Sequence, residues 1–257
     1  MNLLEVSNLT KKFGGLTANS DISMNVREGS ITTVIGPNGA GKTTFFNMIT
    51  GVYRPSAGEI KLEGQSIVGL KPDQVALKGI SRTFQNIRLF GDMSVIENVL
   101  VGMHTHLRGN LFGVFLNLPN TRKEEKEAEY DAYQLLEYFH LEKVLNEKAG
   151  SLSYGNQRKL EMARALATKP KLLLLDEPAA GMNPRETKEL TEIILRIREE
   201  FQITILLIEH DMKLVMDISD HIIVLDHGEK IAEGSPDEVR TNPKVVEAYL
   251  GKAATKL

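Results

Sequence analysis

The sequence predicts an α/β protein built on an open parallel sheet that binds a ligand along one edge. Three continuous apolar runs predict buried strands, because such runs are expected where both faces of a parallel sheet are covered. The runs are residues 31–35, 172–175 and 203–208. A polar group follows each run: a glycine-rich turn, then Asp176 with Glu177, then His210. Ligands of such sheets bind outside the carboxyl ends of the strands, so we expect one ligand to meet all three groups.

Composition and charge narrow the class of protein. The chain has 257 residues, 42% of them hydrophobic and 25% charged, as in an ordinary globular protein. A net charge of −3 gives no bulk attraction to nucleic acid or anionic lipid, and the lack of cysteine excludes disulfide and thiol chemistry. We expect no secretory signal, and no apolar run approaches the roughly 20 residues that cross a bilayer. Any membrane role is therefore expected through a partner, and the lack of an internal repeat predicts one ligand site per chain.

The N-terminal part predicts a second, antiparallel sheet beside the parallel one. Residues 3–13 and 22–26 alternate apolar and polar side chains, as half-buried strands do. Glycines at 14–15 and at 29 punctuate these strands. Residues 60–64 are interpreted as another short strand of the same sheet.

A phosphate cradle is predicted between the first buried strand and a helix that residues 44–49 begin. The turn fits G-x-x-x-x-G-K-[ST], whose glycines let successive N–H groups point inward, and the helix N-terminus adds its dipole. Lys42 would reach the β- and γ-phosphates of a nucleotide, and the Thr43 hydroxyl would ligate Mg²⁺. The alternative is a glycine-rich turn without a ligand. The candidate ATP-binding residues of the cradle are Gly36, Pro37, Asn38, Gly39, Ala40, Gly41, Lys42, Thr43 and Thr44.

Two residues outside the cradle are further candidates. Phe13 ends the first strand, where its ring either stacks on an adenine or packs in the core. Gln85 follows a helix expected to start near Pro72, and we place it at a strand end. A glutamine there contacts Mg²⁺ or the attacking water, or it is simply solvated.

A helical region is predicted over residues 94–150. The charge run at residues 122–127 is interpreted as a solvated helix face. The apolar segment 111–116 is too short to span a membrane. We expect it to be core of the helical region, with a docking surface as the alternative.

A long helix is predicted to open at residues 152–157 and to run through residue 166. Ser153 is a good N-cap for it. Gly155 costs helix stability within the first turn, and the N-cap reading does not explain it. A glycine at this place permits close approach of a ligand.

The two remaining strand ends carry groups suited to hydrolysis. Asp176 would hold Mg²⁺ through water, and Glu177 would point to the place where a water attacks the γ-phosphate. Solvated turn acids are the alternative. His210 would hydrogen-bond the γ-phosphate, or it has a structural role.

Short signals mark the other elements near the C-terminus. Residues 183–186 and 235–238 predict helix starts with capping boxes. Residues 226–229 predict a hairpin turn between two strands. Residues 252–257 are expected to fray.

In combination, these motifs resemble those of the ATP-binding subunits of ABC transporters. The matching motifs are the Walker A (36–44), the Q-loop glutamine Gln85, the signature (152–156), the Walker B (172–176) followed by Glu177, and the switch histidine His210. The resemblance implies a P-loop NTPase with a RecA-like core, an antiparallel β subdomain and a helical subdomain. It implies the core and β subdomain at residues 1–90 and 160–250, the helical subdomain at about 91–159, and a tail at 251–257.

The resemblance also implies a head-to-tail dimer, with each ATP between the Walker A of one subunit and the signature of the other. The signature residues facing the opposite subunit's ATP would be Ser153, Tyr154, Gly155 and Asn156. Tyr154 and Asn156 depart from the usual Leu-Ser-Gly-Gly-Gln, and Asn183 stands where an aspartate is usual. Ser153 and Gly155, which resemble the phosphate-contacting positions, are kept.

Within the family, the chain is most similar to the larger of the two ATPases of branched-chain amino-acid importers. Residues 81–86, the insert 107–133 and the end 242–251 carry this similarity. It implies ATP and Mg²⁺ as cofactors, a second ATPase subunit that is identical or paralogous, two membrane permease subunits, and indirectly a substrate-binding protein. It implies no nucleic acid partner and a place at the cytoplasmic face of the membrane, peripheral through the permeases.

The mechanism implied by the resemblance assigns a role to each motif. ATP binding closes the dimer, Glu177 activates a water, and His210 and Lys42 stabilise the transferring phosphoryl group. Gln85 passes the movement to the membrane subunits, and Thr43, Gln85 and Asp176 are the Mg²⁺ candidates.

Competing functions come from other classes. One is the ATPase of another ABC system, for lipid or lipopolysaccharide export or for urea or amide import. Another is a non-transport ABC ATPase acting on nucleic acid or ribosomes, but such proteins usually carry two cassettes in one chain. A third is a P-loop kinase or GTPase, which would not need residues 152–156.

Overall fold

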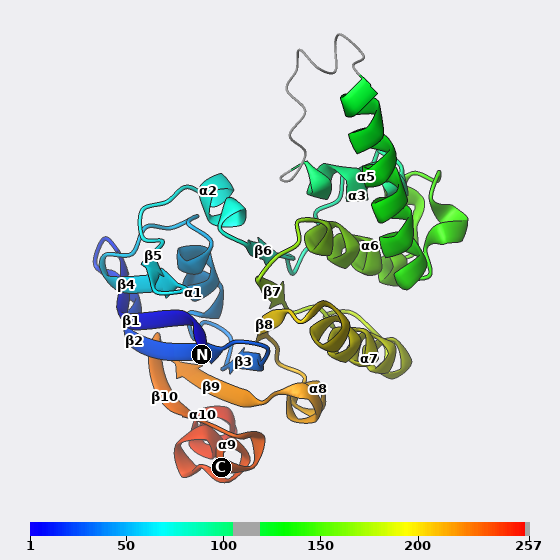
Figure 1. The fold of residues 1–257 in the computed structure, drawn as a ribbon. Coiled ribbons are helices and arrows are strands. Elements are labelled where there is room, and N and C mark those ends of the chain that lie inside the picture. Colours follow the sequence, from blue (N-terminus) through cyan, green and yellow to red (C-terminus); the bar gives the residue numbers. More distant parts are fainter. Residues whose placement is uncertain (105–118, 255–257) are drawn as a thin grey trace. The chain divides into compact units, whose positions relative to one another are not determined.

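The computed structural model describes residues 1–104 and 119–254 (Figure 1). The chain divides into two compact units, Met1–Arg82 with Lys171–Leu257, and Thr83–Pro170. Residues 105–118 and 255–257 lie outside the described residues. The first of these ranges contains the predicted apolar segment 111–116 and the first part of the insert 107–133.

The first unit contains a six-stranded sheet with the order β10-β9-β3-β8-β7-β6. Its strands are β3 Ile31–Ile35, β6 Ile80–Arg82, β7 Leu172–Asp176, β8 Thr204–Ile208, β9 His221–Asp226 and β10 Glu229–Gly234. Neighbouring strands run parallel except β9 and β10, which form the predicted hairpin. Every residue of β3, β7 and β8 is buried, which confirms the three apolar runs as strands covered on both faces.

A four-stranded sheet with the order β2-β1-β4-β5 lies in the same unit. Its strands are β1 Asn2–Phe13, β2 Leu16–Arg27, β4 Ala57–Leu62 and β5 Gln65–Ser66. All of its strand pairs are antiparallel, which confirms the second sheet. β2 begins at Leu16 rather than at residue 22, because its polar first half pairs with β1, with Thr17 opposite Lys12. Backbone pairing of polar residues leaves no apolar alternation to detect in the sequence.

Six helices are described in the first unit (Figure 1). They are α1 Lys42–Ile49, α2 Pro72–Leu77, α7 Pro184–Phe201, α8 Met212–Ile218, α9 Pro236–Thr241 and α10 Pro243–Ala254. α1 joins the two sheets in one core, where its Phe45 lies with Leu4 of β1 and Leu206 of β8. A second core contains Val215 of α8 and Val224 of β9, so the parallel sheet is covered on its other face as well.

Capping residues set several helix starts at their predicted places. Asn183 and Ser235 each accept a backbone N–H at the start of α7 and α9, and both capping boxes are complete. α1 begins at Lys42, two residues before the predicted start. α10 continues through Ala254, so the fraying expected from residue 252 is wrong for 252–254, where lysine and alanine favour helix.

The second unit is helical. Its elements are α3 Val95–Met103, α5 Pro119–Tyr138, two single turns of 3-10 helix at Glu142–Val144 and Ala149–Ser151, and α6 Tyr154–Ala167. α3 packs against both α5 and α6. The unit spans 83–170 and is longer than the expected 91–159, because α6 continues unbroken past residue 159. Lys123 and Glu127 form an exposed ion pair on α5, which confirms the solvated face at these two positions.

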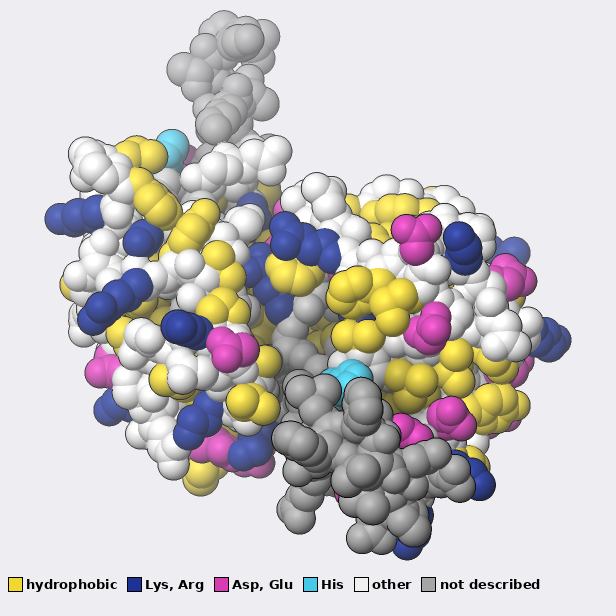
Figure 2. Space-filling model, turned by 90° about the horizontal axis from the view of Figure 1, so that it is seen from above, with side chains coloured by type: hydrophobic (Ala, Val, Ile, Leu, Met, Phe, Trp, Pro, Cys, Tyr) yellow, Lys and Arg dark blue, Asp and Glu magenta, His cyan; other side chains and the backbone are white. Residues whose placement is uncertain are grey.

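The described surface mixes charges of both signs. Figure 2 shows lysine and arginine side chains interspersed with acidic and apolar ones on the face that it draws. This mixture matches the small net charge of the chain. Within residues 1–104 and 119–254, none of the helices combines the length and apolar composition that a membrane span needs.

Candidate nucleotide site

The carboxyl ends of three neighbouring strands form one edge of the parallel sheet. β8 lies between β3 and β7, and the register places Val34, Ile208 and Asp176 in one row across them. Three features lie directly beyond this row. The cradle follows β3, Glu177 follows β7, and His210 follows β8 after one residue. The predicted meeting of three polar strand ends is therefore confirmed as a feature of the fold.

Two other elements hold the cradle from outside. Gly41 has φ 94°, and a Cβ there would overlap the carbonyl oxygen of Ala18 on β2. Asn19, the next residue of β2, is fully buried and donates its side-chain amide to the Gly41 carbonyl at 3.3 Å. The N–H of Gly228, in the β9–β10 turn, donates to the Ala40 carbonyl at 3.1 Å. The carbonyls of Ala40 and Gly41 are thus bonded, and α1 starts directly after them, as in known anion sites.

Lys42 is the first residue of α1 and is almost fully buried. Its Nζ donates to the carbonyl oxygens of Gly36 at 2.6 Å and Pro37 at 3.1 Å. Burial lowers the pKa of Lys42, while the negative charges of Glu177 and Asp176 oppose that shift. A desolvated ammonium group held at the cradle is suited to bind an anion, because phosphate oxygens can replace the two carbonyls.

Asp176 ends β7 and is only 4% exposed. Its Oδ2 accepts from the Arg82 guanidinium at 2.6 Å, and the same guanidinium donates to Asn47 Oδ1 at 2.7 Å. The alternative reading of Asp176 as a solvated turn acid is therefore wrong. Local sequence patterns do not predict Arg82 as the partner of Asp176, because the pairing of β6 with β7 cannot be read from either segment alone.

Glu177 and His210 face each other beyond the row. Glu177 Oε2 lies 3.5 Å from His210 Nδ1. Glu177 has φ 46°, a left-handed conformation that costs about 1–3 kcal/mol at a residue with a side chain and is common at functional sites. Its N–H donates to the Ile208 carbonyl of β8 at 2.9 Å, which fixes it against the neighbouring strand.

Glu209 connects the loops that follow β7 and β8. Its side chain is fully buried, and Oε1 accepts the Ala179 N–H at 2.9 Å. Its Oε2 accepts the N–H groups of His210 at 2.8 Å and Asp211 at 3.2 Å. Glu209 is a residue of this edge that the sequence motifs do not predict. The available signal was an acidic residue directly after an otherwise apolar strand.

The donor groups at this edge suit Mg²⁺ bound together with a nucleotide. Mg²⁺ uses one or two carboxylates, waters and substrate phosphates rather than an all-protein cage. Asp176 supplies one carboxylate, and the exposed hydroxyl of Thr43 lies at the start of α1. The described residues contain no group of three or more His, Cys, Asp or Glu side chains arranged to hold a metal ion.

Phe13 lies at the end of β1 and is 42% exposed, so its reading as a core residue is wrong. Its ring makes an edge contact with Tyr53 at a centroid distance of 5.2 Å, and Lys11 Nζ lies 4.9 Å from its centroid. Stacking on adenine stays a prediction. In the cradle, Asn38, Gly39 and Thr43 are exposed, Pro37, Gly41 and Thr44 are half-buried, and Gly36, Ala40 and Lys42 are buried.

The other predicted site residues belong to the helical unit. Ser153 caps α6, and its Oγ accepts the Asn156 N–H at 3.4 Å. Tyr154 is exposed, and Gly155 is half-buried in the first turn. Gln85 is exposed but does not lie at a strand end, because β6 stops at Arg82 and the following backbone bonds to α6 instead.

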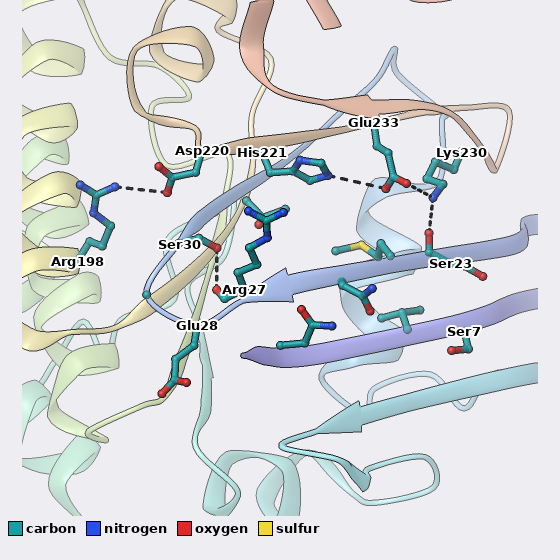
Figure 3. Close-up of a pocket in the computed structure, with 16 residues that line it drawn as sticks. Ser7, Ser23, Arg27, Glu28, Ser30, Arg198, Asp220, His221, Lys230 and Glu233 are labelled. Carbon is teal, nitrogen blue, oxygen red and sulfur yellow. Dashed lines mark hydrogen bonds and ion pairs between the residues drawn. The ribbon is translucent and has the colours of Figure 1, made fainter. Parts of the chain in front are cut away.

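A polar pocket of about 820 Å³ lies at the opposite edge of the parallel sheet (Figure 3). The turn before β3 and His221, which begins β9, line it. Several of its charged side chains pair with one another: Arg198 with Asp220 at 3.4 Å, and Glu233 with Lys230 at 3.0 Å and with His221 at 3.8 Å. This pocket is separate from the cradle, because residues near the amino ends of β3 and β9 line it, whereas the cradle follows the carboxyl end of β3.

Family models match two parts of the chain. A model described as "ABC transporter" matches residues 19–180, which include the cradle, Gln85, the signature and Asp176 with Glu177. A second model, described as "Branched-chain amino acid ATP-binding cassette transporter", matches residues 229–255.

Proteins with related sequences and folds extend over almost the whole chain. The high-affinity branched-chain amino acid transport ATP-binding protein BraF of Pseudomonas aeruginosa is 50% identical over 251 residues, 98% of each chain. A crystal structure of the ADP conformation of an ATP-binding cassette of an ABC transporter has a TM-score of 0.84 at 36% identity, covering 98% of this chain and 99% of that one. A dimeric cassette in a post-hydrolysis state, bound to ADP and phosphate, has a TM-score of 0.77 at 26% identity, covering 91% and 98%.

Proposed function

The chain belongs to the ABC transporter family, and from that premise we propose that it is the ATP-hydrolysing subunit of a branched-chain amino-acid importer. One observation carries the proposal of ATP hydrolysis. The cradle, the carboxylates of Asp176 and Glu177, and the imidazole of His210 share one edge of a parallel sheet, with the buried ammonium of Lys42 beside them. The substrate class rests on the relatives, since BraF is described as a branched-chain amino acid transport protein.

The cradle binds the phosphates of ATP, and Phe13 stacks on the adenine. Lys42 exchanges the carbonyls of Gly36 and Pro37 for oxygens of the β- and γ-phosphates. Thr43, Asp176 and Gln85 are the residues that would hold Mg²⁺, and the ion would neutralise charge on the phosphate oxygens.

Glu177 is the general base of hydrolysis in this proposal. Its carboxylate accepts a proton from the attacking water. The hydrogen bond from its N–H to the Ile208 carbonyl of β8 fixes the backbone that carries this carboxylate. His210 leaves its contact with Glu177 and donates a hydrogen bond to the γ-phosphate. Lys42 and His210 together stabilise the charge of the transferring phosphoryl group.

A second ATPase subunit, identical or paralogous, completes each site. The N-terminus of α6, with Ser153, Tyr154, Gly155 and Asn156, offers N–H groups and the positive end of a helix dipole to the ATP of the other subunit. The dimeric relative that holds ADP and phosphate supports this arrangement. In each subunit, the β sheets carry the cradle and the helical unit carries the signature.

Separate membrane subunits form the transport path. Two permease subunits bind this chain at the cytoplasmic face of the membrane, and the segment around Gln85 transmits closure of the dimer to them. A substrate-binding protein acts indirectly through the permeases, and no nucleic acid is involved.

Reconstitution tests the proposed function. The chain is purified with its membrane partners, placed in liposomes with the binding protein, and assayed for ATP hydrolysis with leucine, isoleucine or valine. We expect these amino acids to stimulate hydrolysis and to be transported, and we expect Glu177→Gln to abolish both. Stimulation by a lipid, urea or an amide, but not by these amino acids, would assign the chain to another ABC transport system.

A further inference from the structure

The helical unit contains a cation buried among main-chain acceptors. Arg158 of α6 is 0% exposed. One terminal nitrogen donates to the Phe84 carbonyl at 2.6 Å and to Glu161 at 3.0 Å. The other donates to the Gln85 carbonyl at 2.8 Å and to the Tyr154 hydroxyl at 2.9 Å. Both terminal nitrogens therefore bridge α6 to the segment around Gln85.

Glu161 holds the same segment through its N–H groups. One carboxylate oxygen accepts the Arg88 N–H at 3.1 Å and the Phe84 N–H at 3.4 Å, and the other pairs with Arg158. Burial raises the pKa of Glu161, while the Arg88 N–H and the Arg158 charge oppose that shift. One turn of α6 thus bonds both N–H groups and carbonyls of the segment that follows β6.

A buried ion pair is a poor source of stability, because desolvation offsets much of the attraction between the charges. The geometry explains its presence better than a gain in stability does. A guanidinium group presents a rigid planar fork, which a lysine lacks. The two terminal nitrogens of this fork donate to four acceptors, and a lysine ammonium has only three N–H donors. The acceptors are the carbonyls of Phe84 and Gln85, the Glu161 carboxylate and the Tyr154 hydroxyl.

Tyr154 joins this network to the surface. Its side chain is 45% exposed, its hydroxyl accepts from Arg158, and its ring centroid lies 5.6 Å from the guanidinium carbon. Tyr154 follows the N-cap Ser153 directly. A group that approaches the signature therefore meets a side chain that is two hydrogen bonds away from the Gln85 carbonyl.

We propose that Arg158 and Glu161 are positioning residues that fix the Gln85 segment to α6, and that Tyr154 transmits contact at the signature to this segment. We call Tyr154, Arg158 and Glu161 the α6 tie. The second part of the proposal rests on the proposed function, because the contact in question is with the ATP of a second subunit. The tie lies entirely within Thr83–Pro170, so the signature and the Gln85 segment are expected to move as one body.

Hydrogen exchange measured by mass spectrometry tests the tie without nucleotide. Arg158→Lys keeps a positive charge but loses the fork, and Glu161→Gln keeps one acceptor oxygen. We expect the Phe84 and Arg88 N–H groups to exchange roughly tenfold faster or more in both variants. Glu161→Gln removes the carboxylate that accepts these N–H groups, and Arg158→Lys removes the guanidinium that holds that carboxylate. Equal acceleration across α3, α5 and α6 would indicate a merely structural role and would overturn the proposal, as would unchanged exchange in folded variants.

A second arm adds Mg-ATP to chains that carry Glu177→Gln, which are expected to hold ATP in a closed dimer. In the parent, exchange should slow both at the cradle and at residues 83–90. Tyr154→Phe removes one hydroxyl but keeps the main-chain N–H of residue 154, and the change at 83–90 is read relative to the change at the cradle in the same sample. We expect this ratio to fall to half of the parent's or less. Tyr130→Phe, on an exposed position of α5, is the matched control and should behave as the parent does.

The outcomes separate the two proposals. An undiminished change at 83–90 in Tyr154→Phe would overturn the role of Tyr154. If ATP fails to slow exchange at the parent's cradle, the proposed function is wrong and so is transmission from a bound ATP. In that event the nucleotide-free comparison still decides whether Arg158 and Glu161 position the Gln85 segment.

Discussion

At the scale of single residues, charged groups at the sheet edge are buried and each has defined partners. Lys42 bonds two cradle carbonyls, Asp176 bonds Arg82, and Glu209 accepts three backbone N–H groups. Charges are rarely buried without such partners. Substitution of each of these residues therefore has a specific expected effect that can be measured.

Replacing Lys42 by alanine should remove most of the affinity for ATP. Hydrogen bonds to charged groups contribute about 1.5–3 kcal/mol each, so loss of the phosphate contacts predicts binding that is roughly 100-fold weaker or more. A nucleotide titration by calorimetry measures this. Lys61→Ala, on an exposed position of β4, is the control, and parental affinity in Lys42→Ala would contradict the assignment of the cradle.

Replacing Glu177 by glutamine should separate binding from hydrolysis. A positioned general base contributes about 10²–10⁴-fold, so we expect hydrolysis to slow by that factor while ATP still binds. Single-turnover measurement with radiolabelled ATP gives the chemical step directly. Hydrolysis at the parental rate would show that Glu177 is not the base.

Glu209→Gln should lower kcat without weakening ATP binding. The amide NH₂ would face a backbone N–H, so at least one of the bonds to Ala179, His210 and Asp211 is lost, at about 1–3 kcal/mol. We expect kcat to fall about tenfold as Glu177 and His210 lose their alignment. Steady-state kinetics with Glu199→Gln, an exposed acid of α7, as the control measures the effect, and an unchanged kcat would refute it.

The sequence predicts some residues of the site and misses others for a physical reason. Lys42, Asp176, Glu177 and His210 stand in local patterns whose chemistry can be read in order. Arg82, Arg158 and Glu209 act through partners distant in sequence or through burial. Nothing in a local pattern shows that a particular arginine will be buried.

At the scale of elements, local signals predicted helix starts and buried strands well. Asn183 and Ser235 cap the helices that their sequences indicate, and β3, β7 and β8 match the apolar runs. The start of β2 was misplaced, and α10 includes residues 252–254, where fraying was expected. Both depend on polar or charged residues, whose conformation is decided by pairing and by helix continuation rather than by an apolar pattern.

The β9–β10 turn supports the cradle and offers an element-scale test. Gly228 has φ 82°, its N–H bonds Ala40, and a Cβ there would overlap the Ala18 carbonyl. We expect Gly228→Ala to lower the melting temperature and to weaken ATP binding, because the turn must move away from the cradle. Gly64→Ala is the matched control, since Gly64 has φ 73° but open space around its Cα.

Differential scanning calorimetry and nucleotide titration measure both variants. The left-handed conformation costs each alanine variant about 1–2 kcal/mol. The difference between them therefore reports the close approach at the turn. Equal effects on ATP affinity would show that the turn does not support the cradle.

At the scale of the whole molecule, the division into two units could be foreseen only in outline. The helical composition of residues 94–150 predicts a separate region. Its boundaries at Thr83 and Pro170 depend on the packing of α3 on α6 and on the bonds of Arg158, which connect residues distant in sequence. Composition changes gradually along the chain and does not mark such boundaries.

Mixed dimers test whether two subunits share each site. A dimer of one Lys42→Ala subunit and one Ser153→Arg subunit keeps one site with an intact cradle and an intact signature. We expect such a dimer, isolated with two different affinity tags, to hydrolyse ATP at about half the sites, while dimers of either variant alone stay inactive. Complete inactivity of the mixed dimer would argue against shared sites.

The α6 tie also sets the rule for exchanging parts between related cassettes. Grafts joined at residues 91 and 159 would take Arg158 from one parent and Phe84, Gln85 and Glu161 from the other. Grafts joined after Arg82 and before Lys171 transplant all of them together and cross the unit boundary only twice. Chimeric transporters built at the second pair of junctions should still couple ATP hydrolysis to the membrane subunits of the parent that donates the helical unit. In those built at the first pair, Arg158 and its bonding partners come from different parents.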